Sequence, residues 1–238
     1  MLSVVIPVLN EAAGIGICLA FLQTWGDRLE IIVVDGGSED QTLEVVRQFS
    51  QVKVLQSPAG RGWQMNEGAA IATRETLLFL HGDTQLPATF LADIEQTLQR
   101  DQVIAGAFPL RIADDNPQLR WIERLVQWRS QFFSLPYGDQ CIFLKTKDFR
   151  QFGGYRPLPI MEDYELMQRL KQYGKIALAE HPVTTSSRRW QKLGIWRTTW
   201  INQLMILGYH LRIDPDKLRT WYRHQATMQP SKLPTNHD

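Results

Sequence analysis

The first hundred residues alternate between short apolar runs and segments with helical periodicity. The runs LSVVIPV and EIIVVD consist mainly of β-branched and aliphatic side chains, as in strands that are buried on both faces, and VKVLQS and TLLFL indicate two further strands. Between the first two runs, Ile15, Leu19 and Leu22 recur at helical spacing, and Asn10 precedes them as a candidate helix cap. Strands that alternate with helices predict an α/β fold with a mostly parallel central sheet flanked by helices.

Polar or glycine-rich residues follow each of these four predicted strands. The clusters are Asn10-Glu11, Asp35-Gly36-Gly37-Ser38, Gly60-Arg61-Gly62 and His81-Gly82-Asp83. Because ligands of such sheets bind beyond the carboxyl ends of the strands, the four clusters should share one ligand-binding edge.

The second half of the chain shows a less regular pattern. VIAGAFPLRI and CIFLK each indicate a strand, and KIALAEHPVTTSS indicates one or two. Residues 118–133 predict a helix that carries Trp121, Leu125, Trp128 and Phe132 on one stripe. A glycine- and proline-rich loop then leads into a helix with a predicted buried face, formed by Leu166, Leu170 and Tyr173.

The C-terminal region contains a second aromatic segment. Trp196, Trp200, Leu204 and Leu207 fall at helical spacings, with arginines nearby. Such a helix either packs against the domain or a second subunit, or lies at a membrane interface. We therefore expect a main domain over 1–193, a helical C-terminal extension over 194–226, and a polar, disordered tail over 227–238.

Composition narrows the functional classes. The chain has 26 Lys and Arg against 25 Asp and Glu, and the net charge of +1 argues against a nucleic-acid partner. Cys18 and Cys141 stand at unrelated spacing in apolar surroundings, which predicts two buried thiols in a reducing compartment. The sequence shows no signal peptide and no apolar segment of spanning length, so we expect a cytoplasmic protein, unless a surface helix holds it at the inner face of a membrane.

Three of the strand-end clusters carry side chains suited to a nucleotide diphosphate. Asp35 can accept hydrogen bonds from a ribose or base, or it can cap a tight turn. Arg61 offers a guanidinium to phosphate at a predicted helix start, or it is a solvated loop residue. Asp83 and Gln85 offer hard oxygen ligands to a divalent metal ion, although an ordinary turn explains them as well.

Two later groups could take part in the reaction. Glu162 and Asp163 are adjacent carboxylates at a predicted helix start, where either could serve as a general base. Arg189 could stabilise a departing phosphate, and Trp190 could cover a sugar face; a basic surface loop is the simpler alternative.

Together these segments resemble one known family. VVIPVLNE, IIVVDGGSEDQT, GRGWQMNEGA, LFLHGDT, FGGY with MEDYELMQRL, and SSRRW occur in the order found in family 2 glycosyltransferases. The resemblance covers about residues 2–190 and implies a GT-A (nucleotide-diphospho-sugar transferase) fold with a helical C-terminal extension. The GRGWQMNEGA version is similar to a small bacterial subfamily assigned to arsenosugar biosynthesis or to glycosylation of a carotenoid carboxylate.

The resemblance implies a UDP- or GDP-linked sugar donor, inversion at the anomeric carbon, and Mn²⁺ or Mg²⁺ as cofactor. It implies Asp163 as the base with Glu162 beside it, and a metal site at Asp83 with Gln85. The implied donor-binding residues are Pro7, Asn10, Glu11, Asp35, Gly36, Arg61, Gln64, His81, Asp83, Arg189 and Trp190. The acceptor, a small molecule or a lipid, is expected near Asp139, Gln140 and Tyr155. Ser186 stands where some members of the family have the Gln of a Gln-x-x-Arg-Trp motif.

Two other functions remain open. A nucleotidyltransferase could share a similar sheet, although PVLNEAAG lacks the glycine-rich loop expected after the first strand. A non-catalytic nucleotide-sugar-binding protein is the other alternative, because His81 replaces the first acid of the metal-binding Asp-x-Asp motif. Peripheral membrane contact and a homodimer are both compatible with the C-terminal segment.

Overall fold

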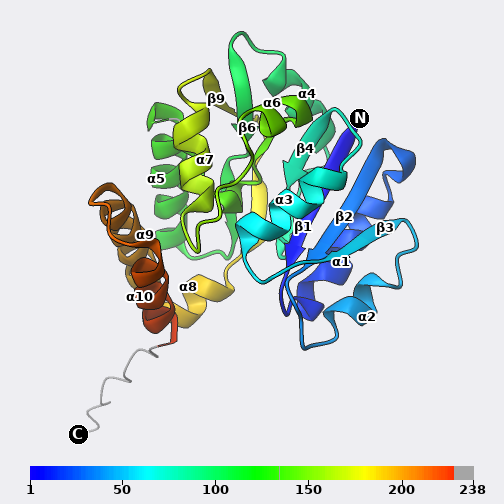
Figure 1. The fold of residues 1–238 in the computed structure, drawn as a ribbon. Coiled ribbons are helices and arrows are strands. Elements are labelled where there is room, and N and C mark those ends of the chain that lie inside the picture. The colour runs from blue at the N-terminus through cyan, green and yellow to red at the C-terminus, as the bar shows by residue number, and fades with distance from the viewer. Residues whose placement is uncertain (134, 228–238) are drawn as a thin grey trace, which may run out of the picture.

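A seven-stranded sheet forms the centre of the protein, in the order β3-β2-β1-β4-β8-β6-β9 (Figure 1). The computed structural model describes residues 1–133 and 135–227, without the side chains of residues 131–133, 189, 226 and 227. Its strands are β1 (Leu2–Val8), β2 (Leu29–Asp35), β3 (Val52–Gln56), β4 (Thr76–Phe79), β6 (Val103–Ala107), β8 (Phe143–Lys145) and β9 (Lys175–Leu178). The predicted α/β architecture with a mostly parallel sheet is confirmed, with β8 as its antiparallel member.

Helices cover both faces of this sheet, because side chains alternate along each strand. Val4 and Ile6 of β1 pack in one cluster with Ile15, Leu19 and Leu22 of α1, and Val5 packs in the other with Met65 of α3. The helices are α1 (Ala12–Gln23), α2 (Thr42–Val46), α3 (Arg61–Ile71), α4 (Phe90–Leu98), α5 (Pro117–Phe133), α6 (Thr146–Gln151), α7 (Glu162–Leu170), α8 (Arg188–Leu193), α9 (Ile195–His210) and α10 (Pro215–Thr227). Both thiols, Cys18 and Cys141, are buried and free, as predicted.

The sheet opens between β1 and β4 at the edge where the polar clusters lie. β4 pairs with β1 only as far as Val5, whereas β2 accompanies β1 to Val8. Pro7, which has no backbone N–H, therefore stands beyond the β4 pairing and costs no ladder hydrogen bond on that side. The strand order reverses at this position, which is where ligands of doubly wound sheets bind.

A second, three-stranded sheet brings the end of the chain back to this opening. It contains β5 (Thr84–Gln85), β10 (Val183–Ser186) and β7 (Leu110–Ala113), in the order β5-β10-β7. Thr184 pairs with Gln85 and Thr185 with Thr84, so that the residues after β10 lie beside Asp83. The segment VIAGAFPLRI, predicted as one strand, is thus two strands that belong to different sheets.

Two local predictions were wrong. Asn10 has a left-handed φ of 57° and does not cap α1; its Oδ1 instead accepts hydrogen bonds from the backbone N–H of Glu39 and Asp40. Tyr173 lies past the end of α7 and is 61% exposed, with its ring 4.4 Å from that of Phe152. Leu166 and Leu170 are buried as predicted.

The C-terminal helices α9 and α10 pack beside each other on the side of the molecule next to α5 and α7 (Figure 1). Arg197 of α9 donates to the backbone and side-chain oxygens of Gln225 on α10. His210 at the end of α9 shares a 2.7 Å hydrogen bond with the hydroxyl of Tyr164 on α7. The extension is therefore tied to the helix that carries Glu162 and Asp163. The predicted tail falls mostly on residues 228–238, which lie outside the described residues.

Candidate active site

The loops after β1 and β2 are bound into one unit by side-chain to backbone hydrogen bonds. The backbone N–H of Asn10 donates to Ser38 Oγ at 2.9 Å, and that of Glu11 donates to Thr42 Oγ1 at 2.8 Å. Asp35 is buried, and its carboxylate accepts from the backbone N–H of Gly37 and Ser38. These hydrogen bonds fix the conformation of the loop after β2, which borders the candidate ligand site.

Gln64 joins the two strands beneath these loops. The side chain is 3% exposed, and its Nε2 donates to the carbonyl oxygens of Val8 and Val34 at 2.8 Å each. A Cβ at Gly36 would lie 3.1 Å from the Gln64 amide, so that only glycine fits there without displacement. Gln64 and Gly36 were predicted as donor-binding residues. Both lie beneath the loops that follow β1 and β2.

Three charged side chains converge at the opening between β1 and β4. Arg188, at the start of α8, places Nη2 at 3.3 Å from Glu11 Oε2 and at 3.3 Å from Asp83 Oδ2. Its Nε also donates to Ser186 Oγ. Burial, and then the charge of Asp83, raise the pKa of Glu11, whereas Arg188 and Arg61 oppose this shift. One guanidinium therefore bridges carboxylates from two different strand ends.

The same two carboxylates fit a divalent cation. Both present oxygen atoms to a single cationic nitrogen, which marks a point where positive charge is stabilised. Carboxylate oxygens are the hard ligands that Mg²⁺ and Mn²⁺ prefer, and a bound diphosphate would complete the coordination. Glu11 was predicted as a nucleotide contact and stands beside Asp83 as a second candidate metal ligand. Gln85 is exposed in β5, and its role as a ligand stays a prediction.

Arg61 and His81 extend this charged edge toward α7. Desolvation would lower the pKa of Arg61, but the nearby charges of Glu162, Tyr222, Asp163 and Asp139 raise it. Burial, followed by the positive charge of Arg61, lowers the pKa of His81 to about 4. His81 is therefore neutral near pH 7 and adds no positive charge next to Asp83.

Asp163 lies in the first turn of α7 and is held by the loop that precedes β8. Its Oδ2 accepts a 2.6 Å hydrogen bond from the backbone N–H of Gly138, and its Oδ1 accepts one from Tyr164 N–H at 2.7 Å. A Cβ at Gly138 would lie 3.1 Å from Asp163 Oδ2 and 3.6 Å from His81 Nε2. The absence of a side chain at Gly138 leaves this space between the base candidate and the strand-end cluster open.

Glu162 is the buried neighbour of Asp163, 7% exposed. Burial first, and the charge of Asp163 second, raise its pKa from 4.5 to about 7. The two adjacent carboxyl groups therefore differ in environment: Glu162 is buried and keeps its proton up to about pH 7, while Asp163 is half-buried.

A pH-dependent stability follows from the raised pKa of Glu162. The folded protein holds this proton more tightly than the unfolded chain, so the stabilising contribution is complete below pH 4.5 and is lost as the pH rises through about 7. We expect the Tm of the native protein to fall more steeply between about pH 5 and pH 8 than the Tm of Glu162→Gln. Scanning calorimetry of both proteins across this range measures the difference, and parallel profiles would contradict it.

The three residues predicted for the acceptor region occupy different environments. Asp139 lies on the Gly138–Gln140 turn and contributes to the field at Arg61. Gln140 is fully buried; its Nε2 donates to Phe108 O and its Oε1 accepts from Ser130 Oγ, so it holds this turn in place. Tyr155 is 2% exposed and packs against Phe79, and burial followed by the charges of Asp163 and Glu162 raises its pKa well above the usual value.

The SSRRW segment contributes a residue that the sequence analysis did not select. Arg188 contacts the carboxylates, whereas the side chain of the predicted Arg189 lies outside the described residues. Trp190 is half-buried and packs against the hydrophobic core beneath α8. The position of Arg188 directly after a predicted strand could have marked it as a candidate site residue. Its place beside Asp83 follows only from the pairing of β10 with β5, which the sequence does not show.

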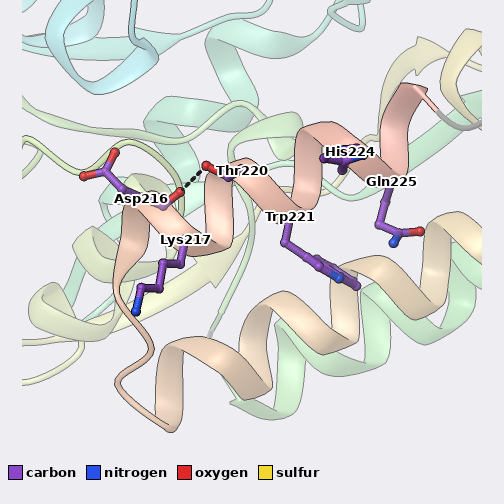
Figure 2. Close-up of a pocket in the computed structure, with 6 residues that line it drawn as sticks. All are labelled: Asp216, Lys217, Thr220, Trp221, His224 and Gln225. Carbon is purple, nitrogen blue, oxygen red and sulfur yellow. Dashed lines mark hydrogen bonds between the residues drawn. The ribbon is translucent and has the colours of Figure 1, made fainter.

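A separate groove of about 570 Å³ lies on α10 and shares no residue with this cluster. Figure 2 shows its lining side chains, all of which project from this one helix: Asp216, Lys217, Thr220, Trp221, His224 and Gln225. A hollow lined by a single helix has few converging polar groups, so the strand-end cluster is the better candidate for catalysis.

Sequence comparison identifies relatives that match part of the chain. A glycosyltransferase for PGL/p-HBAD biosynthesis from Mycobacterium bovis is 38% identical over 94 residues, which are 36% of this chain and 36% of the relative. Glycosyltransferase AglE from Haloferax volcanii is 38% identical over 90 residues, which are 34% of this chain and 30% of the relative. The chain thus matches about a third of the length of these curated relatives.

Structure comparison identifies the fold. The mannosyltransferase PcManGT from Pyrobaculum calidifontis, solved with GDP-Man and Mn²⁺, aligns with a TM-score of 0.66 at 19% identity, over 94% of this chain and 68% of that one. Glucosyl-3-phosphoglycerate synthase from Mycobacterium tuberculosis, solved with Mn²⁺, UDP and glucosyl-3-phosphoglycerate, aligns with a TM-score of 0.58 at 18% identity, over 78% and 70%. These likenesses establish a GT-A fold. The family model for glycosyl transferase family 2 matches residues 3–154, more than half of the 238 residues, and the chain belongs to this family.

Proposed function

We propose that this protein transfers a sugar from a UDP- or GDP-linked donor to a hydroxyl or carboxylate of a small-molecule or lipid acceptor, with inversion at the anomeric carbon. The observation that carries the proposal is the convergence of Glu11, Asp83 and Arg188 at the opening between β1 and β4, with Asp163 on the same edge. An acceptor of the arsenosugar or carotenoid-carboxylate kind would fit the resemblance of GRGWQMNEGA to that subfamily.

The loops after β1 and β2 would receive the nucleoside. Pro7, Asn10, Asp35 and Gly36 line or support these loops, and their rigid hydrogen-bond network would orient the base and ribose without reorganisation. Arg61 and Arg188 would bind the diphosphate by charge-assisted hydrogen bonds, and both stabilise the negative charge that grows on it as the bond to the sugar breaks.

Asp83, with Glu11 or Gln85, would hold a divalent metal ion on the diphosphate side. When bound, Mn²⁺ or Mg²⁺ supplies Lewis-acid stabilisation of the leaving diphosphate. Neutral His81 would leave the negative charge of Asp83 available to the cation instead of competing with it.

Asp163 would remove the proton from an acceptor hydroxyl as the hydroxyl oxygen attacks the anomeric carbon and the bond from that carbon to the diphosphate breaks. The Gly138 N–H fixes Oδ2 and the helix start at Tyr164 fixes Oδ1, so the carboxylate is oriented before the acceptor arrives. With the base on one side of the sugar and the diphosphate on the other, attack and departure occur on opposite faces, which inverts the configuration. Asp139 and Tyr155 would lie on the acceptor side.

A ligand-induced stabilisation tests the proposed donor site. A nucleoside diphosphate at about a hundred times its Kd should add about 2.7 kcal/mol to the free energy of unfolding, which raises the Tm by roughly 5–10 °C. Differential scanning fluorimetry with UDP, GDP, ADP and CDP, each with and without Mn²⁺, measures this shift. We expect UDP or GDP to stabilise the protein only in the presence of the metal. No shift with any of the four nucleotides would overturn the proposed site.

A further inference from the structure

Helix α9 carries apolar side chains around its whole circumference, but the protein covers only one side of it. Ile201 and Met205, with Thr198 and Gly208, form its buried face. The opposite side carries large apolar residues at helical spacing. These are Trp196 (63% exposed), Trp200 (66%), Leu204 (41%) and Leu207 (54%). Single exposed apolar residues are ordinary, whereas a stripe that includes two tryptophans marks an interaction surface.

Helix α5, which contacts α9, exposes a similar stripe. Trp121, Leu125 and Trp128 follow one another at intervals of four and three residues and are 64%, 55% and 53% exposed. Sequence alone placed these residues on one stripe, and the structure shows that the stripe faces outward while Leu119 and Ile122 face the core. We refer to the exposed stripes of α9 and α5 together as the aromatic face.

Positive charge accompanies the aromatic face. Residues 181–213 contain no Asp or Glu but five Lys or Arg residues, in a chain that has 26 Lys and Arg against 25 Asp and Glu overall. Arg188 and Arg197 are engaged in the active site and with α10, but Lys192 and Arg212 are exposed at the two ends of the α9 region. Arg124 of α5 lies over the ring of Trp121, 5.9 Å from its centre.

This charge distribution favours an anionic lipid surface over a second copy of the chain. A two-fold symmetric dimer through the aromatic face would bring two positively charged α9 regions toward each other, with no acidic side chain in 181–213 to neutralise them. Tryptophans with flanking Lys and Arg suit the lipid headgroup region instead. None of the helices in the described part of the chain is both long and apolar enough to cross a bilayer. We propose that the aromatic face docks on the surface of a membrane that contains anionic lipid.

Such docking would place the acceptor side of the active site at the membrane. Tyr164, next to Asp163, bonds to His210 at the end of α9, and its ring packs 5.2 Å from that of Tyr209. Tyr222 of α10 is among the groups that raise the pKa of Arg61. If the proposed transferase function holds, its acceptor is a membrane-resident amphiphile that reaches Asp163 along α9, while the nucleotide enters from the aqueous side.

Vesicle flotation tests this surface directly. The native protein should float with phosphatidylcholine vesicles that contain phosphatidylglycerol and much less with phosphatidylcholine alone. The double variant Trp196→Glu/Trp200→Glu should lose about tenfold or more of its partitioning, because carboxylates would enter the interfacial layer. Ile17→Glu is the matched control: Ile17 is 64% exposed and belongs to α1, which lies across the molecule from α9 (Figure 1), so its variant should float like the native protein.

Circular dichroism and Tm of the double variant establish that it is folded. Native protein that fails to float with the anionic vesicles, or a folded double variant that floats equally well, would overturn the proposal. A native dimer that this variant dissociates in sedimentation would assign the face to a second copy and overturn it too. The nucleotide-induced Tm shift keeps the two proposals apart: a variant that loses flotation but keeps this shift supports the membrane face, whereas flotation without any nucleotide shift in the native protein overturns only the transferase site.

Discussion

Asp163→Asn should lower the rate of sugar transfer by about 10²–10⁴-fold while donor binding stays nearly unchanged. The asparagine amide oxygen can still accept the hydrogen bond from Gly138 N–H, so the loop and the start of α7 keep their positions. The amide cannot take a proton from the acceptor, and the loss therefore falls on the chemical step. Single-turnover transfer measures the rate, and calorimetric titration with the nucleoside diphosphate measures binding.

Asp148→Asn is a suitable control for this variant. Asp148 also lies in the first turn of a helix, α6, but belongs to no part of the proposed site, so its variant should transfer at the native rate. Full turnover by Asp163→Asn would remove Asp163 from the role of base. A parallel loss of donor affinity and rate would instead assign it to donor binding.

Asp83→Asn should weaken Mn²⁺-dependent binding of the nucleoside diphosphate by at least about 10–100-fold, the loss that follows removal of even an outer-shell partner of a metal. The variant keeps the shape of the side chain but removes one of the two carboxylates that converge on Arg188. Isothermal titration of the nucleotide with and without Mn²⁺ measures the effect, and an affinity unchanged in both conditions would exclude Asp83 as a metal ligand.

Arg188→Ala provides a control of opposite sign in the same site. Removal of the guanidinium relieves competition for Glu11 and Asp83, so Mn²⁺ alone should bind more tightly to this variant, as measured by its electron paramagnetic resonance signal. Nucleotide binding should nevertheless weaken, because a cation that faces the diphosphate is lost. Weaker binding of Mn²⁺ alone would show that Arg188 supports the metal site instead of competing with it.

The general position of the site could be predicted because it depends on local patterns. Buried strands can be recognised from their continuous apolar runs, and the parallel arrangement then places all of their carboxyl ends at one edge. Glu11, Arg61 and Asp83 follow β1, β3 and β4, and Asp35 ends β2, so all four lie on this edge, although β3 is a partly exposed edge strand. The helix start at Glu162 was also predictable from its acidic residues before an apolar periodic segment.

The roles of individual side chains within the site depend on contacts between distant parts of the chain. Arg188 is 177 residues from Glu11, and only the pairing of β10 with β5 brings the two together. Gln64 and Gln140 are polar residues near predicted ligand positions, yet their amides satisfy backbone carbonyls in the interior. Tyr173 fits the helical spacing of α7, but the helix ends at Leu170 and the ring turns to the surface. Spacing alone does not specify these partners.

The bridge formed by Arg188 also has a consequence for the order in which ligands arrive. Glu11, Asp83 and Arg188 together carry one net negative charge when ionised, so this bridge by itself does not attract a diphosphate. A divalent cation would reverse that sign and at the same time free the guanidinium from its two carboxylates. The metal ion should therefore bind before the donor or at the same time as the donor. Arg188, released from its two carboxylates, would then contact the diphosphate only when both ligands are present.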